Sequence, residues 1–361
     1  MVMSFGYPCE EHFVTTEDGY ILGVFRIPHG RNQTETNKKP VLLQHGLLDS
    51  SITFIINLPS ESLSYILADA GYDVWLGNNR GNEYSTNHTT LSNSSKEFWE
   101  FSYDEMGLYD LPATVDYILD QTSQSTITYV GHSEGTMQAF IAYLKVPLFS
   151  EKVPLFFALG PVGNVTNITN KGLRTLADFH IDTILRYFGM NRFLPSPTVL
   201  KGLFVDFCIE CDICCADVVE WICGPHKGAF NDSRMPIVSG HEPSGTSTQN
   251  IQHFAQGVTL KQFQMFDYGP VINIQKYQSI YPPIYDLTQF PSTVKIALYS
   301  GTLDELADPI DVKQLVSLLP TSSILNWMII DDYAHLDYVW ALDAHQIIYT
   351  DILSIMSNST L

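Results

Sequence analysis

A serine between two glycines, at the end of an apolar strand, is the strongest sign of chemistry in this chain. Residues 131–135 read Gly-His-Ser-Glu-Gly; a β-type run over residues 126–130 precedes them, and a helical pattern over residues 136–144 follows. On a sharp turn of this kind the serine Oγ projects from the backbone, and the flanking positions must lack bulk. The arrangement predicts a nucleophile elbow with Ser133 as nucleophile. An ordinary strand-to-helix turn can have the same sequence pattern. The presence of a suitable base and acid elsewhere in the chain therefore distinguishes the two explanations.

A histidine base and a carboxylate follow Ser133 in the chain order that such a site requires. Residues 293–301 form a predicted strand that ends in a turn carrying Asp304, and residues 324–330 form another that leads to His335. Both side chains come just past strand ends, so we expect them at the edge of the sheet where the serine lies. The histidine would accept the serine proton, and the aspartate would fix the imidazole tautomer.

Four other residues compete for these two roles. Asp308 stands one residue before a proline and is better explained as the cap of a helix that begins there. Asp331 and Asp332 are typical turn residues. His345 lies within a helical stretch, where a surface or packing role is the simpler explanation. We therefore prefer the aspartate and histidine named above.

A second strand end suggests an oxyanion hole. Residues 41–47 read as a buried strand that ends in His45-Gly46. The loop after such a strand supplies one backbone N–H, here that of Leu47, and the residue after the nucleophile, here Glu134, supplies the other. A plain strand-ending turn is the alternative explanation of the His-Gly pair.

Length and composition allow one large α/β core, interrupted by an insertion, and the strand–turn–helix order of the nucleophile elbow suits a mostly parallel sheet. The chain has 361 residues, of which 45% are hydrophobic. Residues 1–160 and 290–361 carry the core pattern, and residues 161–289 differ in character. We expect this insertion to form a helical cap that shields an apolar pocket, although the apolar stripe near its start also suits a core helix. No apolar run approaches the roughly 18 residues needed to span a bilayer.

The charge balance narrows the class of partner. The formal net charge is −20, which excludes the basic footprint of a nucleic-acid-binding protein. It also disfavours electrostatic docking to anionic membranes, so contact with lipid should be apolar. A low isoelectric point suits an acidic compartment, because protonation would relieve self-repulsion there.

Short stretches along nearly the whole chain carry a family resemblance. They are Gly6-Tyr7-Pro8 with Glu10-Glu11, residues 16–22, residues 43–48, residues 69–78 with Arg80-Gly81-Asn82, Phe98-Trp99 with Phe101-Ser102, Asp104-Glu105-Met106, residues 109–113, Gly245-Thr246-Ser247 with Gln249-Asn250, residues 306–309, and His335-Leu336-Asp337. On these motifs the chain resembles the acid lipase family, that of gastric lipase and lysosomal acid lipase. The resemblance implies an α/β-hydrolase core, a helical cap and hydrolysis of neutral-lipid esters, and we expect no cofactor.

The resemblance can be carried over residue by residue. It implies Ser133, Asp304 and His335 as the catalytic triad, and Leu47 with residue 134 as the oxyanion donors. One departure matters, because family members usually have glutamine after the nucleophile and this chain has Glu134. The backbone donor survives, but a carboxyl group now stands where negative charge develops.

The cysteines gather in the expected cap, at Cys208, Cys211, Cys214, Cys215 and Cys223, with Cys9 far away. The C-x2-C-x2-C spacing could suggest zinc, but no second pair follows in a separate loop, and we expect no metal. By the family resemblance, Cys215 and Cys223 match two cap cysteines, the first bonded and the second free. The family partner position falls at Asp206, so Cys208 would be the shifted partner; the pairing of the others stays open.

Glycosylation sequons point to an oxidising compartment. They begin at Asn32, Asn87, Asn93, Asn164, Asn167, Asn231 and Asn358. Residues 1–4 lack the charged and apolar regions of a signal peptide. The sequons favour a mature secreted or lysosomal chain with a replaced start, and a product without an export signal is the alternative.

Three functions compete at this point. The first is a serine ester hydrolase that acts on triacylglycerol or cholesteryl ester at a lipid–water interface. The second is a lipid-binding protein of the same fold, in which Glu134 impairs the oxyanion site. The third is an esterase with the same chemistry on short, soluble esters.

Overall fold

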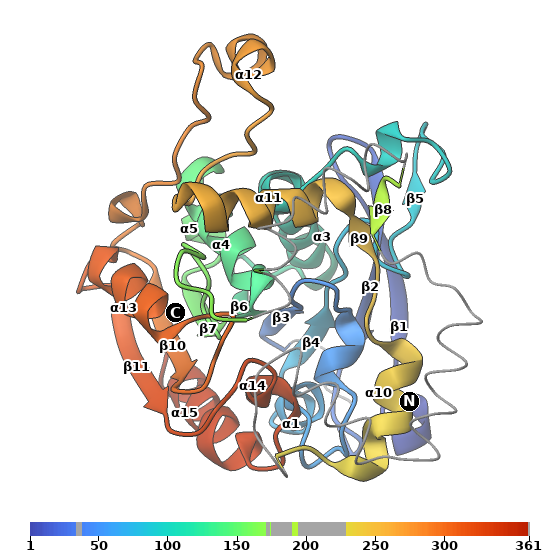
Figure 1. The fold of residues 1–361 in the computed structure, drawn as a ribbon. Helices are drawn as coiled ribbons and strands as arrows, with labels where there is room; N and C mark the ends of the chain where they lie inside the picture. Colours follow the sequence, from blue (N-terminus) through green and yellow to red (C-terminus); the bar gives the residue numbers. More distant parts are fainter. Residues whose placement is uncertain (34–37, 171–173, 175–189, 194–228, 360–361) are drawn as a thin grey trace.

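The computed structural model describes residues 1–33, 38–170, 174, 190–193 and 229–359 (Figure 1). A nine-stranded sheet crosses the middle of this part of the chain. Its strands are β1 (Glu10–Thr15), β2 (Tyr20–Ile27), β3 (Pro40–Gln44), β4 (Asp73–Leu76), β5 (Asn87–His88), β6 (Thr128–His132), β7 (Leu155–Leu159), β10 (Lys295–Gly301) and β11 (Ile324–Ile330). A separate two-stranded ladder joins β8 (Arg192–Phe193) to β9 (Thr246–Ser247).

Helices connect and cover these strands. They are α1 (Leu63–Asp69), α2 (Tyr103–Glu105), α3 (Leu111–Thr122), α4 (Glu134–Lys145), α5 (Phe149–Lys152), α10 (Met235–His241), α11 (Thr248–Leu260), α12 (Pro270–Tyr277), α13 (Pro309–Leu318), α14 (Asp337–Trp340) and α15 (Thr350–Asn358). No helix among the described residues is both long enough and apolar enough to cross a membrane.

The sheet order is β1-β2-β4-β3-β6-β7-β10-β11, with β5 paired to β2. β1 and β2 run antiparallel to their neighbours, and every pair from β4 to β11 is parallel. From β3 the chain goes first to β4 on one side and later to β6 on the other. Sites in open α/β sheets form at such a switch point, beyond the carboxyl ends of the strands. The predicted α/β fold with a mostly parallel sheet is confirmed.

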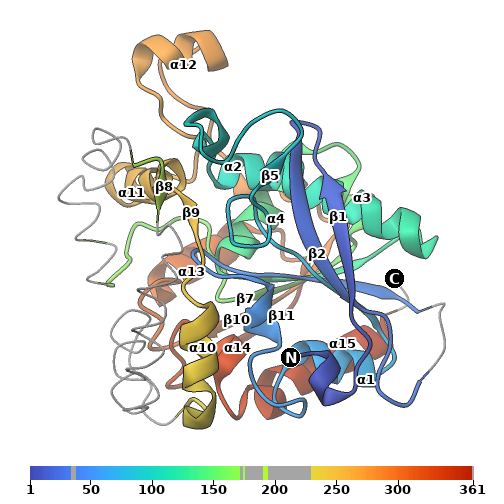
Figure 2. The ribbon, with the colours of Figure 1, turned by 90° about the vertical axis from the view of Figure 1, so that its right-hand side faces the viewer.

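The sheet is buried on both faces, as parallel sheets usually are. In β3, Leu42 packs into one apolar core with Trp75, whereas Val41 and Leu43 face the other core. This alternation follows from the two-residue period of a strand. Helices α3 and α4 contribute to the first core and α1 and α15 to the second, on opposite sides of the sheet (Figure 2). Each fully buried aliphatic side chain adds about 1.5–3 kcal/mol, which is why continuous apolar runs occupy the central strands.

The elements around the predicted site lie close to their expected places. The strand predicted for residues 126–130 is β6, shifted toward its carboxyl end, because ladder pairing with β3 and β7 begins at Thr128. Helix α4 begins at Glu134, two residues before the predicted start, since the chain enters the helix directly after the serine. The two later strands, β10 and β11, coincide with their predictions apart from the first residues of β10.

Of the predicted insertion over residues 161–289, the structure describes mainly the part from residue 229 onward. Helix α10 packs into the same apolar core as α1 and α15, and Phe230 forms a β-bridge with Ala341. Helix α11 lies across the carboxyl-end side of the sheet, and α12 projects away from the body in both views (Figures 1 and 2). Most of the predicted apolar stripe, from Leu173 to Phe188, and the cysteine cluster lie outside the described residues.

Candidate active site

Ser133 occupies a strained backbone position at the turn between β6 and α4. Its φ is +54° and its ψ is −120°, a backbone conformation that residues other than glycine rarely adopt. The flanking glycines permit the turn. A Cβ on Gly135 would lie 2.6 Å from the carbonyl oxygen of Gln44, and one on Gly131 would lie 2.9 Å from the carbonyl carbon of Gly135. Neither contact can be relieved without moving backbone, so the glycines are a steric requirement of the elbow.

The structure brings the three predicted triad side chains together. His335 Nε2 lies 2.7 Å from Ser133 Oγ, and its Nδ1 lies 2.9 Å and 3.0 Å from the two carboxylate oxygens of Asp304. Ser133 follows β6, Asp304 follows β10 and His335 follows β11, all at the carboxyl edge of the sheet. With Nδ1–H donated to the carboxylate, Nε2 is left to accept the serine proton. The geometry can therefore generate a serine nucleophile.

Asp304 is held as an ionised acceptor. Burial alone would raise its pKa, but the nearby His335 and several hydrogen bonds outweigh burial and hold the pKa below the usual range for aspartate. Those donors are the backbone N–H groups of Leu306 and Ala307, at 2.9 Å and 2.8 Å from Oδ1, and the Tyr338 hydroxyl, at 2.9 Å from Oδ2. A carboxylate with this many donors keeps the imidazole oriented.

The competing residues have other surroundings. Asp308 caps α13, because its Oδ1 accepts the backbone N–H of Ile310 at 2.8 Å. Asp331 and Asp332 form an exposed turn, and His345 is partly buried at the start of the π-helical turn that precedes α15.

The loop after β3 packs against the serine. A Cβ on Gly46 would lie 2.9 Å from Ser133 Cβ, so only glycine permits this approach. His45 Nδ1 lies 2.8 Å from the Gly46 carbonyl oxygen, and its Nε2 accepts the backbone N–H of Asn79 at 3.1 Å. A carbonyl can only accept and an amide N–H can only donate, so His45 is neutral with its proton on Nδ1. Burial agrees, since it lowers the pKa of His45 to about 4.

This bond orients the peptide that carries the predicted oxyanion donor. The Gly46 carbonyl and the Leu47 N–H belong to one planar peptide unit, so fixing the carbonyl fixes the N–H on its other side. The second predicted donor, the backbone N–H of Glu134, belongs to the first turn of α4, where amides lack partners within the helix. Helix amino ends also favour negative charge.

The Glu134 side chain is buried between two asparagines. Oε1 accepts Asn250 Nδ2 at 2.6 Å and Oε2 accepts Asn79 Nδ2 at 3.4 Å. Asn250 Oδ1 in turn accepts the backbone N–H of Tyr103, so its amide faces Glu134 with the nitrogen. Burial raises the pKa of Glu134 to about 7, and the Asn250 hydrogen bond counteracts only part of that rise.

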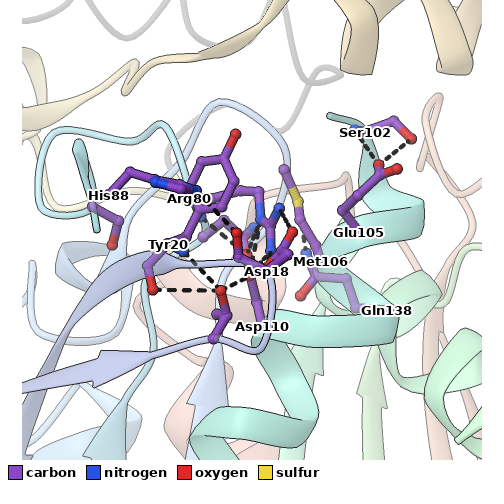
Figure 3. Close-up of polar contacts among 12 residues, drawn as sticks. Asp18, Tyr20, Arg80, His88, Ser102, Glu105, Met106, Asp110 and Gln138 are labelled. Carbon is purple, nitrogen blue, oxygen red and sulfur yellow. Dashed lines mark hydrogen bonds and ion pairs between the residues drawn. The ribbon is translucent and has the colours of Figure 1, made fainter. Parts of the chain in front are cut away.

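A buried arginine fixes the loop that supplies Asn79. Figure 3 shows Arg80 between Asp18 and Asp110: its Nη1 lies 2.6 Å from Asp18 Oδ2, and its Nη2 lies 2.6 Å from Asp110 Oδ1. The guanidinium also stacks 3.9 Å above the centre of the Tyr20 ring. Arg80 is 1% exposed, so these partners offset the cost of burying its charge. The network holds the segment whose Asn79 contacts both Glu134 and His45.

Several polar residues of the site had no role assigned from the sequence. His132 Nε2 donates to the His335 carbonyl at 2.9 Å and so fixes the backbone of the base. Tyr338 bonds the acid, and Asn79 and Asn250 bond Glu134. Asn250 did lie in a family-like motif, Gln249-Asn250, but nothing in its neighbours identified its partner. Among the described residues, no group of three or more His, Cys, Asp or Glu side chains is arranged to hold a metal ion.

The predicted glycosylation acceptors differ in how exposed they are. Asn32, Asn87, Asn93 and Asn358 are exposed, as a glycosylation acceptor must be, whereas Asn164, Asn167 and Asn231 are partly buried. Asn167 Nδ2 already donates to Asp311 at 2.7 Å. Cys9 has a free, partly buried thiol. The predicted Cys208–Cys215 bond lies outside the described residues.

Comparisons with known proteins place this geometry in context. The profile of the α/β hydrolase fold matches residues 39–342, and that of a partial α/β-hydrolase lipase region matches residues 1–58. Gastric triacylglycerol lipase of Rattus norvegicus is 44% identical over 99% of this chain and 90% of its own length. Lysosomal acid lipase/cholesteryl ester hydrolase of Homo sapiens is 42% identical over 99% of this chain and 89% of its own length.

Solved structures agree on the fold. A soluble variant of monoglyceride lipase from Saccharomyces cerevisiae, bound to a substrate analog, superposes with a TM-score of 0.61 at 12% identity, covering 98% of this chain and 96% of its own. A thermophilic esterase from Thermogutta terrifontis gives a TM-score of 0.53 at 13% identity, covering 96% and 98% of the two chains.

Proposed function

Because the chain belongs to the acid lipase family of α/β hydrolases, we propose that it is a serine ester hydrolase that cleaves neutral-lipid esters through an acyl-enzyme. The observation that carries the proposal is His335, whose two ring nitrogens lie 2.7 Å from Ser133 Oγ and 2.9 Å from Asp304 Oδ1. Triacylglycerol and cholesteryl ester are the candidate substrates, because relatives named for each share over two-fifths of the sequence across nearly the whole chain.

The proposed reaction follows from these positions. Ser133 Oγ attacks the ester carbonyl while its proton passes to His335 Nε2, and Asp304 stabilises the imidazolium. The carbonyl oxygen becomes an oxyanion that accepts hydrogen bonds from the backbone N–H groups of Leu47 and Glu134. The intermediate then collapses: the C–O bond to the alcohol breaks, and His335 protonates the leaving oxygen. Water repeats the sequence on the acyl-enzyme, which releases the fatty acid and restores Ser133.

The wider organisation is part of the same proposal. We assign residues 1–160 and 290–361 to the hydrolase core and residues 161–289 to a cap over the site. A secreted or lysosomal location is supported by relatives named for the stomach and the lysosome, and by the exposed sequons. The substrate would be met at a lipid–water interface, with no nucleic acid involved.

The decisive experiment combines one probe with three substrates. We expect a fluorophosphonate to label the parent protein but not Ser133→Ala, and the parent to hydrolyse emulsified triolein and cholesteryl oleate at about pH 5. Ser133→Ala and His335→Ala should each lose at least about 10³-fold in kcat. Folded Ser133→Ala protein that retains more than about a hundredth of the activity would refute the assignment.

Two other functions are separate outcomes of this experiment. A parent protein that binds lipid but neither reacts with the probe nor turns over any ester would be a binding protein of the same fold. Turnover of tributyrin below its solubility limit, without turnover of emulsified long-chain esters, would mark an esterase for soluble substrates.

A further inference from the structure

Exposed apolar side chains concentrate on one projecting hairpin. They are Val271, Ile272 and Ile274 of α12, followed by Ile280, Tyr281 and Ile284, and we call this set the α12 tip. Their exposed fractions run from 43% for Ile272 to 73% for Tyr281. The other exposed large apolar side chains of the described chain are scattered along the sequence. A cluster of this kind needs an explanation that single exposed residues do not.

The α12 tip has a well-ordered base. At the base, Met265 and Tyr285 donate backbone N–H groups across the hairpin to Pro283 and Phe263, each at 2.9 Å. In the helix, Asn273 is fully buried; its Nδ2 donates to Asp267 Oδ1 at 2.7 Å and to the Ile280 carbonyl at 3.0 Å. The polar groups that shape the hairpin therefore bond one another beneath the apolar side chains. The exposed apolar side chains therefore lie on a hairpin whose backbone is held in place by hydrogen bonds.

The near absence of charge on the hairpin indicates what kind of surface could cover it. The whole chain carries a formal charge of −20, yet residues 268–285 contain no acidic residue and a single cation, Lys276. The nearest acids along the chain are Asp267 and Asp286, at the two ends of this stretch. An uncharged apolar surface with one long cation suits a lipid boundary, where Lys side chains can extend toward water.

The hairpin also continues the element that contacts the active site. Helix α11 carries Asn250 in its first turn, where Asn250 bonds Glu134 next to Ser133, and the helix runs for about 20 Å to Leu260, just before the hairpin. Both figures show α12 extending beyond this helix, clear of the sheet (Figures 1 and 2).

We propose that the α12 tip is a docking surface for the surface of a neutral-lipid droplet, into which its apolar side chains insert. The proposal rests on the proposed function, since a droplet is the phase in which a long-chain lipid ester resides. Docking there would hold the enzyme at its substrate while leaving the chemistry of Ser133 unchanged.

A matched pair of variants tests this docking. The tip variant carries Val271→Ser, Ile274→Ser and Tyr281→Ser; the control carries Phe13→Ser, Leu148→Ser and Ile329→Ser, three exposed apolar residues on other elements. Flotation with triolein droplets covered by phosphatidylcholine measures partition directly, in a Ser133→Ala background that removes turnover. We expect partition of the tip variant to fall at least about tenfold, and that of the control to change less than about twofold.

Activity then separates docking from catalysis. With Ser133 intact, the tip variant should hydrolyse dissolved tributyrin at the parental rate and emulsified triolein at least about tenfold more slowly at low enzyme concentration. Equal partition of tip variant and parent would overturn the proposal, as would equal losses for the tip and control variants. A parental dimer that only the tip variant dissociates would also overturn it, in favour of a second copy of the chain. Strong parental flotation without any ester turnover would refute the proposed function and leave docking intact.

Discussion

At the level of single residues, we expect the protonation of the Glu134 carboxyl group to influence the proposed oxyanion site. Its backbone N–H is a proposed oxyanion donor, and its side chain is buried with a pKa raised to about 7 by that burial. Below this pKa the group is neutral and does not oppose the tetrahedral intermediate. Above it, a buried carboxylate follows directly after the nucleophile in the chain, and we expect it to oppose the negative charge that develops on the substrate.

Replacing Glu134 by glutamine should therefore extend activity toward neutral and alkaline pH. We expect kcat/KM of Glu134→Gln to match the parent at about pH 5 and to exceed it several-fold at about pH 8, where the parental carboxyl is ionised. The variant keeps an oxygen for Asn250, so its fold should be retained. Complete pH profiles of the two proteins on dissolved tributyrin provide the measurement. Superimposable profiles would mean that the carboxyl group does not influence the oxyanion.

The sequence alone predicted the three side chains that the structure brings together, but not the groups that hold them in place. Ser133, Asp304 and His335 follow strand ends, and strand ends can be recognised from apolar runs. His132 and Asn250 could not be assigned roles, because their partners lie far away in the chain and come close only through packing.

At the level of elements, the loop after β3 and the segment before β9 are joined by two buried carboxyl groups. Asp49 and Glu242 share Ser50, whose N–H donates to Asp49 Oδ1 at 2.7 Å and whose Oγ donates to Glu242 Oε1 at 2.7 Å. Burial raises the pKa of Asp49 to about 7; burial and then Asp49 raise the pKa of Glu242. The nearby Glu83 raises the pKa of Glu242 further. The two groups therefore hold on to a proton, and ionisation of both at higher pH would oppose the contact.

Asp49→Asn should strengthen this junction at neutral pH. The amide keeps an oxygen for the Ser50 N–H and replaces Oδ2 with an uncharged donor. Because the pKa of Asp49 is higher in the folded state than in the unfolded state, its contribution to the stability of the parent protein falls as pH rises from about 4 to about 7. The variant should thus unfold at about the same temperature as the parent near pH 4, and several degrees higher at about pH 8. Thermal unfolding of both proteins tests this.

A surface aspartate provides the control for that comparison. Asp331 is exposed in a turn, so Asp331→Asn should leave the unfolding temperature unchanged at either pH. An Asp49→Asn protein that is less stable than the parent at about pH 8 would contradict the electrostatic explanation.

Strands and helix caps could be predicted from the sequence more readily than the contacts that join one element to another. The apolar runs of β3, β6, β10 and β11 and the cap of α13 by Asp308 could be recognised from the sequence, because each depends on residues within one short window. The junction between Asp49 and Glu242 could not, since it joins groups nearly two hundred residues apart. Local patterns indicate strands and caps, whereas long-range polar contacts depend on how the whole chain packs.

At the scale of the whole molecule, we expect two kinds of buried titratable group among the described residues to dominate the dependence of stability on pH near neutrality. Among the residues that the structure describes, burial raises the pKa of seven carboxyl groups, although opposing contacts offset part of the shift at each of them. They are Asp49, Asp104, Glu105, Asp110, Glu134, Glu242 and Asp311. Burial lowers the pKa of three histidines, His45, His132 and His253, to about 4, 3 and 3. The two sets act in opposite directions.

The signs follow from proton binding. Between about pH 4 and pH 7 the folded carboxyl groups bind more protons than the unfolded ones, so stability falls as pH rises. Between about pH 3 and pH 6.5 the unfolded histidines bind more protons than the folded ones, so stability rises with pH. The effects partly cancel below about pH 6.5, and above it only the carboxyl groups still titrate.

We therefore expect the free energy of unfolding to be largest at mildly acidic pH and to fall by several kcal/mol between about pH 6 and pH 8. Urea unfolding across this range measures it. Self-repulsion from the net charge of −20 acts in the same direction, but salt screens it, with a Debye length of about 3 Å at 1 M. The decline should persist in 1 M NaCl and become shallower in an Asp49→Asn, Glu134→Gln double variant. A decline abolished by salt, or unaltered in the double variant, would assign it to surface charge instead of the buried carboxyl groups.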